Sequence, residues 1–352
     1  MNLHLATAGE SHGPALVAIV SGLPAGLLLD REAIDADLHR RQQGYGRSPR
    51  QQIERDTVEV LAGLRHGRTL GTPLALVVRN RDHENWLWGM SPWPPEGEPS
   101  GKGTKPVTLP RPGHADLAGT QKFELDDTRD ALERASARHT AVSVAAGAVA
   151  KALIREIGIE LTSSVAGDDL ERRVDEARAD RDTVGGIVEV RARGVVAGLG
   201  SYATKEERLD ARLAAALMGI QAVKGVEIGD GFALAGLRGS EAHDEILPGG
   251  RKTNRAGGIE AGVSNGEEIV VRAAMKPLPT LMRPLRSVDL ATGEPGEALV
   301  ERSDTAAVEA LAVVAEAAVS WELARAAREK FGGDSIGDFR GAWQAYRQRI
   351  AT

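Results

Sequence analysis

Two long segments rich in small residues place the strongest constraint on the fold of this chain. The first runs from about residue 132 to 157, and the second runs from a capping residue at Ser303 or Asp304 to about residue 330. Both have helical periodicity, with Ala and Val on the inner face. Because aromatic residues make up only 3% of the chain, the core must consist mainly of Leu, Val, Ile and Ala. We therefore expect closely packed helices that face sheets.

Apolar and alternating runs predict strands around these helices. They cover residues 3–7, 15–21, 58–64, 72–79, 159–165, 184–193, 225–235 and 268–275. Shorter helices are predicted at 30–42, with Asp30 as N-cap, and at 168–182 and 208–220. This pattern predicts mixed strands and helices.

One segment, at about 85–106, has a different composition. It carries Trp86, Trp88 and Trp93 among Pro, Gly and Glu residues. Such tryptophans need a surface to pack on, so we interpret the segment as a structured insertion over one face and not as a linker. We expect a single domain over residues 1–352.

Composition excludes several classes of protein. The chain has no cysteine, which excludes disulfides and thiolate chemistry and fits a reducing compartment. It shows no secretory signal and no apolar run of about 18 residues, so we expect a cytoplasmic protein without membrane contact. The net charge is −6, yet arginines cluster in glycine-rich loops. This favours a small polyanionic ligand over nucleic acid.

Two histidines and one aspartate lie in turns that can expose them. His12 lies in the loop Gly9-Glu10-Ser11-His12-Gly13, His114 follows Arg111-Pro112-Gly113, and Asp334 follows Gly332-Gly333. Each suits proton transfer without a metal. For His12, a loop histidine bonded to a backbone carbonyl remains an open alternative, and Asp334 could equally cap a helix-ending turn. Nucleotide-binding and hydrolase motifs are absent from the sequence.

Five motifs together resemble the chorismate synthase family along nearly the whole chain, from Thr7 to about Ile336. They are Gly9-Glu10-Ser11-His12-Gly13, Arg40-Arg41-Gln42-Gln43-Gly44-Tyr45-Gly46-Arg47, Arg111-Pro112-Gly113-His114-Ala115-Asp116, Arg134-Ala135-Ser136-Ala137-Arg138 and Gly332-Gly333-Asp334-Ser335. Each motif is weak alone, but the combination is very specific.

The resemblance implies a lyase of the shikimate pathway. This activity converts 5-enolpyruvylshikimate 3-phosphate to chorismate by 1,4-elimination of phosphate and a C6 hydrogen, with reduced FMN as cofactor and NADPH as a source of reductant. It also implies a family-specific β-α-β sandwich, with helices packed between antiparallel sheets, that assembles as a homotetramer.

The resemblance further implies roles for individual residues. His12 would donate a proton near the leaving phosphate, His114 would partner the reduced flavin, and Asp334 would assist C6 deprotonation near flavin N5. Ser11 and Ser136 would act as relays, and the substrate or NADP would be held by Arg41, Arg47, Arg111 and Arg138. The implied FMN contacts are Arg134, Ala135, Ser136, Gln221, Ala222, Ala261, Lys276, Pro277, Leu278, Pro279, Thr280 and Arg302, the last just before a helix start.

Three positions depart from the family pattern. His139 stands where Glu is usual, Ser143 where Arg is common, and Ser48 where Gly is common. An alternative hypothesis is an FMN-dependent oxidoreductase that acts on a phosphorylated carboxylate and consumes NADPH. A second alternative, an arginine-rich nucleic-acid-binding protein, is disfavoured by the acidic net charge.

Overall fold

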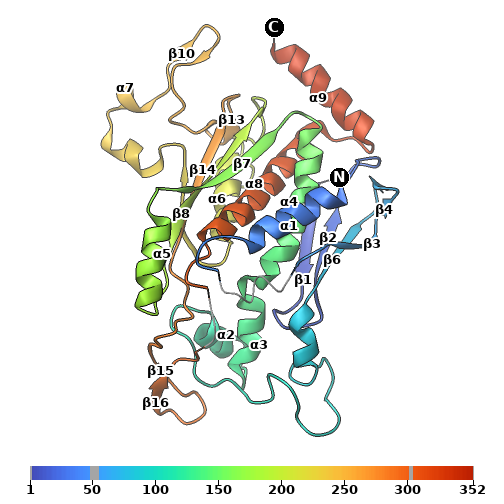
Figure 1. Ribbon diagram of the computed structural model, residues 1–352. Helices are drawn as coiled ribbons and strands as arrows, with labels where there is room; N and C mark the ends of the chain where they lie inside the picture. The colour runs from blue at the N-terminus through green and yellow to red at the C-terminus, as the bar shows by residue number, and fades with distance from the viewer. Residues whose placement is uncertain (1, 48–54, 301–303, 352) are drawn as a thin grey trace.

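The two small-residue segments form the central helices of the molecule, α4 (Thr140–Arg155) and α8 (Val308–Phe331) (Figure 1). The structure is a computed structural model that describes residues 2–47, 55–300 and 304–351. The two helices pack against each other, and each also packs on a four-stranded sheet. The arrangement is an α+β sandwich with helices between antiparallel sheets, which confirms the predicted fold class.

The first sheet contains β1 (His4–Ala8), β2 (Ala15–Ser21), β6 (Leu74–Arg79) and β3 (Glu59–Ala62), in that order. The second contains β7 (Glu160–Ala166), β8 (Gly186–Arg193), β14 (Ile269–Met275) and β9 (Val223–Ile228). All pairings are antiparallel, as in Leu16↔Val78 and Val190↔Val271. The first sheet packs on α4 and the second on α8.

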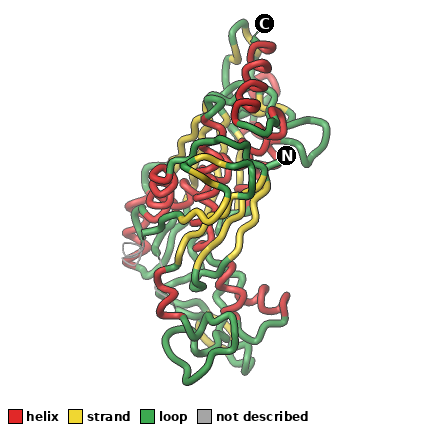
Figure 2. The backbone as a smooth tube through the Cα atoms, turned by 90° about the vertical axis from the view of Figure 1, so that its right-hand side faces the viewer, coloured by secondary structure: helices red, strands yellow, loops and turns green. Residues whose placement is uncertain are grey.

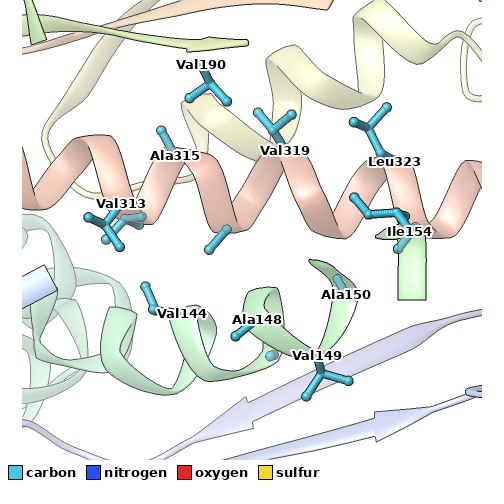
Figure 3. Packing of buried hydrophobic residues seen from close by; sticks show 14 of the residues in the cluster. Val144, Ala148, Val149, Ala150, Ile154, Val190, Val313, Ala315, Val319 and Leu323 are labelled. Carbon is cyan, nitrogen blue, oxygen red and sulfur yellow. The ribbon is translucent and has the colours of Figure 1, made fainter. Parts of the chain in front are cut away.

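Small residues allow α4 and α8 to approach closely. A Cβ placed on Gly147 of α4 would lie 2.3 Å from the Cβ of Ala317 in α8, well inside van der Waals contact. Figure 3 shows Val144 and Ala148 of α4 near α8, while Val190 of the second sheet lies on the other side of α8. One continuous core of buried residues includes both helices and both sheets.

Shorter elements surround this core. Those of the sandwich are α1 (Arg31–Gln42), α5 (Leu170–Ala179), α6 (Leu209–Met218) and α9 (Ile336–Ile350), with β4 (Leu64–Arg65), β5 (Arg68–Thr69), β12 (Ile259–Glu260) and β13 (Val263–Ser264). A protruding arm contains η4 (Gly231–Gly236), α7 (Gly239–Ala242), β10 (Ile246–Leu247) and β11 (Gly250–Arg251). A loop-rich part at the opposite end contains η2 (Arg81–Trp86), α2 (Asp116–Phe123), α3 (Thr128–Ala135), β15 (Arg286–Val288) and β16 (Pro295–Glu297) (Figure 2).

Most predicted elements agree with the structure, including the Asp30 cap, whose carboxylate accepts from the Glu32 amide. Three differ. The predicted helix from 132 to 157 is broken at Ser136, whose backbone is extended, so α3, η3 (Ala137–His139) and α4 replace it. The α8 helix begins at Val308 after Ala307, with no side-chain cap. Strand β9 ends at Ile228, and residues 231–236 form η4.

Candidate active site

A cavity of about 580 Å³ lies where α4 and α8 begin, between the sandwich and the loop-rich part. This volume is within the range of small-molecule sites. The first turns of both helices line the cavity, and the N-terminal end of a helix favours anions. The predicted residues that line it are Ser11, His12, Arg41, Arg47, Arg111, His114, Ala135, Ser136, Arg138, Gln221, Ala222, Lys276, Leu278, Pro279 and Thr280.

His12 reaches the cavity from the loop between β1 and β2. The buried carboxylate of Glu133 holds it twice, since Oε2 accepts from the His12 amide at 2.8 Å and Oε1 lies 2.8 Å from ring Nδ1. A carboxylate offers only acceptors, so Nδ1 carries the proton in this contact. The Nε2 atom is therefore the ring nitrogen left for a ligand.

His114 is held in a similar way. Its Nδ1 contacts Oδ1 of Asp116, a fully buried residue at the start of α2. Arg111 also binds this carboxylate, with Nε 2.8 Å from Oδ2. Burial alone would raise the pKa of Asp116, but hydrogen bonds from His114 and Arg111 outweigh it and hold the pKa well below its usual range. Asp116 is thus ionised, and His114 presents Nε2.

Two arginines form a buried cluster around one aspartate. Arg138 Nη1 lies 2.6 Å from Asp56 Oδ2, and Arg41 Nη1 lies 3.5 Å from the same oxygen. Arg41 also donates from Nε to the Thr140 hydroxyl at 2.8 Å, at the start of α4. Both arginines also line the cavity, where their guanidinium groups can meet an anionic ligand.

Further charged groups complete the lining. Arg47 pairs with Asp304 at 2.8 Å, both side chains 12% exposed, and the buried Arg47 Nε has no hydrogen-bond partner among the described groups. Lys276 contacts the carbonyl of Gly113. Burial, with the nearby charge of Lys224, lowers the pKa of Lys276. The described part of the lining includes Asp304 as its one carboxylate.

The cavity also contains groups suited to a planar heterocycle such as a flavin. Gln221 Oε1 is buried and lacks a hydrogen-bond partner among the described residues, so it is available to a ligand donor. The neighbouring Ala222 has a left-handed φ of 67°, which is unusual for a residue with a Cβ and is often found at ligand sites. Lys276, Leu278, Pro279 and Thr280 form an adjacent extended wall. These residues fit a flavin with an anionic phosphate.

Four predicted residues lie elsewhere. Arg134 points away, with its guanidinium on the carbonyls of Thr7 and Gly9. Ala261 is the exposed turn between β12 and β13, and Pro277 is exposed beside the cavity wall. Asp334 follows the C-terminal end of α8, whereas the cavity lies at its N-terminal end. A 24-residue helix spans about 36 Å, so Asp334 does not line the cavity, whereas it was expected near flavin N5.

Two other named positions, Arg302 and Ser48, lie outside the described residues. His139, a departure from the family pattern, bonds through Nδ1 to the Ser136 carbonyl and lies next to the Gln221 amide. Burial, reinforced by the charges of Arg134 and Arg41, lowers the pKa of His139 and favours its neutral form. Ser143 is half-buried in the first turn of α4.

Several site residues were missed from the sequence. Glu133 and Asp116 orient the two histidines, Asp56 joins two arginines, and Asp304 faces Arg47. Asp116 lies two residues after His114, a spacing that could have suggested the contact. Glu133 is 121 residues from His12, and Asp56 is 15 residues from Arg41 and 82 from Arg138, so no local pattern links these groups.

The described part of the chain contains neither a candidate metal site nor a candidate membrane-spanning helix. Among residues 2–47, 55–300 and 304–351, no cluster of three or more His, Asp or Glu side chains is arranged to hold a metal ion. Within the same ranges, no helix has the length and apolar character needed to cross a membrane.

Comparison with known proteins gives a consistent result. A family model described as chorismate synthase matches residues 3–327. A protein named chorismate synthase from Pelobacter propionicus is 51% identical, with 99% of this chain and 100% of the relative covered. A protein of the same name from Rubrobacter xylanophilus is 50% identical, with 99% of this chain and 98% of the relative covered. A crystal structure titled as chorismate synthase matches with a TM-score of 0.78 and 36% identity, over 99% of this chain and 98% of that chain.

Proposed function

Because the chain belongs to the chorismate synthase family, we propose that the cavity at the start of α4 and α8 is where it carries out the family's reaction. The protein is a lyase that converts 5-enolpyruvylshikimate 3-phosphate to chorismate and phosphate by 1,4-elimination, the last step of the shikimate pathway. The observation that carries the proposal is a single cavity lined by four arginines and by two histidines, each of which is bound by a carboxylate.

Reduced FMN is the proposed cofactor. When bound, it supplies electron density to the substrate as phosphate departs and recovers it as hydrogen is lost. We assign its ring to the wall formed by Gln221, Ala222 and residues 276–280, where the unpartnered Gln221 Oε1 offers an acceptor. Ala135, Ser136 and the neighbouring positive groups suit the remainder of the molecule.

The two histidines handle protons in this proposal. His12 Nε2 donates to the phosphate oxygen that leaves, while Glu133 holds Nδ1 and balances the positive ring. His114 Nε2 holds the proton next to the flavin, with Asp116 and Arg111 behind it. The Ser136 hydroxyl lies 3.2 Å from the Ser11 hydroxyl, which makes the pair a route for proton relay.

Arginines orient the substrate. Its phosphate and carboxylates together carry several negative charges, and a guanidinium binds such groups in a bidentate manner. Arg41, Arg138 and Arg111 are held by buried aspartates, so their geometry is fixed before a ligand arrives. Preorganisation of this kind lowers the entropic cost of binding.

Asp304 takes the role that was expected of Asp334. Its carboxylate lines the cavity and pairs with Arg47, which orients it. We assign it the proton acceptance that accompanies loss of the C6 hydrogen. Arg47 and Arg41 are also the proposed contacts for NADPH as a reductant source.

The remaining features of the proposal concern the whole protein. We propose a cytoplasmic homotetramer of single-domain chains. The continuous core supports the single domain. Exposed Ile19 and Val60 of the first sheet and Ile187 of the second offer apolar surface to other subunits. An FMN-dependent oxidoreductase is not favoured, because the relatives that match over the full chain are named for the lyase.

Substitution of the histidines tests the proposal. We expect His12→Ala and His114→Ala each to lower kcat by about 10² to 10⁴, the usual contribution of a positioned proton donor or acceptor. His243→Ala, on the exposed arm, is the matched control and should turn over normally. Chorismate formation under anaerobic conditions with reduced FMN is the measurement. Near-normal turnover in either cavity variant removes that histidine from the mechanism.

A further inference from the structure

The start of the tryptophan-containing insertion has a structural role that the reaction scheme above does not use. Trp86 is the last residue of η2 and is 6% exposed, whereas Trp93 of the same insertion is 77% exposed. The Trp86 indole Nε1 donates to Asp82 Oδ2 at 3.0 Å, so the indole has one defined orientation. A buried, oriented tryptophan in an otherwise irregular segment packs on something specific.

Its packing partner is the imidazole of His12. The two ring centroids are 4.0 Å apart and the planes are inclined by 19°, which is a stacked arrangement. Trp86 therefore covers one face of the imidazole. The guanidinium of Arg129 also lies over the Trp86 ring, 4.9 Å from its centroid.

The stack complements the hydrogen bond from Glu133. A single contact at Nδ1 fixes one ring atom but leaves the ring free to tilt about that contact. The stack on Trp86 fixes the plane of the ring, because a tilt would bring the two ring systems into collision or separate them. The His12 carbonyl is held as well, 2.9 Å from His83 Nδ1 in the same η2 segment.

We infer that Trp86 is a positioning residue for His12, and that the start of the insertion serves to direct His12 Nε2 into the cavity. The inference rests on the proposed role of His12. Trp86 touches the imidazole but does not line the cavity. It acts by holding the ring plane and by keeping water from the contact between Nδ1 and Glu133.

Substitution of Trp86 tests this inference. Trp86→Met keeps apolar volume but loses the ring, Trp86→Phe restores a smaller ring, and Trp93→Met is the control at an exposed position. We expect Trp86→Met to lower kcat by about 10-fold to 100-fold, the effect of a misplaced reacting group. KM should stay near the wild-type value, and Trp86→Phe should recover most of the rate. Trp86→Leu replaces the Met variant if that variant does not fold.

A spectroscopic measurement separates positioning from general destabilisation. In protein labelled with ¹⁵N-histidine, the His12 Nδ1 proton, assigned by its loss in His12→Ala, should give a slowly exchanging signal. That signal should broaden or vanish in Trp86→Met and persist in Trp86→Phe and Trp93→Met. An unchanged signal together with wild-type kcat in Trp86→Met overturns the inference.

A double-mutant cycle distinguishes this inference from the proposed function. If Trp86 acts through His12, Trp86→Met should cause no further loss of kcat in the His12→Ala background. If the losses of kcat in the two single variants add fully in the double variant, Trp86 does not act through His12, even where His12→Ala alone is slow. Conversely, a fast His12→Ala enzyme contradicts the proposed role of His12, while the nuclear magnetic resonance measurement still tests whether Trp86 holds the ring.

Discussion

At the scale of single residues, the site depends on buried carboxylates that hold the groups facing the ligand. Glu133 and Asp116 each bind the Nδ1 atom of a histidine, and Asp56 binds two arginines. Each carboxylate is nearly or fully buried and is compensated by several donors. The histidines and arginines are therefore oriented before the substrate and cofactor arrive.

The choice between Asp304 and Asp334 is the sharpest prediction at this scale. Asp304→Asn keeps the shape of the side chain but removes the negative charge that pairs with Arg47 and the proposed proton acceptor. We expect kcat to fall by about 10² or more. Asp334→Asn, at the opposite end of α8, should stay within about threefold of wild type. The reverse ranking in a chorismate assay would return the role to Asp334.

Local motifs drew attention to His12, His114 and the arginine clusters, and the family resemblance added Ser11 and Ser136; these residues line one cavity in the structure. Glycine-flanked turns and arginine clusters are local signals, so they can be recognised without the fold. Glu133 could not be recognised in this way, because its partner lies 121 residues away and only the fold brings them together. The turn Gly332-Gly333-Asp334 indicates exposure but not position, and Asp334 lies at the end of α8 opposite the cavity.

At the scale of elements, a helix break places the reacting groups. Ser136 interrupts the predicted helix, with an extended backbone, and its hydroxyl caps the Arg138 amide. The break turns Ser136 toward Ser11 and lets α4 begin at the cavity. Helix propensity favoured continuity, since Ala, Arg and Ser are compatible with a helix. The tertiary contacts of the site overrode it.

The close contact of α4 and α8 gives a prediction on stability. In Gly147→Ala, the added Cβ would meet Ala317 at 2.3 Å for Cβ and 2.6 Å for Cα. Overpacking costs about 1–3 kcal/mol, while helix propensity returns about 1 kcal/mol. Because the added Cβ would meet backbone as well as side-chain atoms of Ala317, we place the cost at the upper end, about 2–3 kcal/mol, and expect a net loss of about 1–2 kcal/mol in the free energy of unfolding by urea.

The control for this substitution lies in α9. Gly341 is exposed and helical, and a Cβ there would meet nothing within 4 Å. Gly341→Ala should therefore stabilise the protein by about 0.5–1 kcal/mol, through helix propensity alone. Equal effects of the two substitutions would contradict the proposed close packing.

At the scale of the whole molecule, two antiparallel sheets enclose the helices (Figures 1 and 2). The cavity lies where α4 and α8 begin, at one end of the sandwich. The sequence predicted most strands and helices, since each is a local pattern. The order of strands in the sheets could not be derived from periodicity, because pairings such as β6 with β2 and β3 depend on long-range contacts. The topology was implied only by the family resemblance.

Buried ionised groups make stability depend on pH. Burial would raise the pKa of Glu316, but its hydrogen bond to Arg40 and the charge of Lys151 lower it. The pKa of Asp116 is also lowered. The unfolded chain therefore binds more protons than the folded chain below the ordinary carboxyl pKa of about 4, and stability is lost as pH falls through that region. The pKa of His139 is lowered as well, so below about pH 6.5 the unfolded chain takes up this proton first and a smaller part of the stability is lost.

We therefore expect the free energy of unfolding, measured in urea, to fall slightly between pH 7 and 5 and steeply between pH 4 and 3. Glu316→Gln should be less stable at pH 7, since Arg40 and Lys151 lose a buried partner. It should also lose less stability between pH 4 and 3. A flat profile down to pH 3 in the unmodified protein would show that folding does not lower the pKa of these carboxylates.

The central claim is that this cavity performs a redox-neutral elimination that requires a reduced flavin. The most direct measurement is anaerobic incubation of the purified protein with reduced FMN and 5-enolpyruvylshikimate 3-phosphate, while chorismate, phosphate and reduced flavin are followed together. We predict chorismate and phosphate in equal amounts over many turnovers, with no net loss of reduced flavin and no product with oxidised FMN. Oxidation of one flavin for each product formed, or phosphate release without chorismate, would contradict the account.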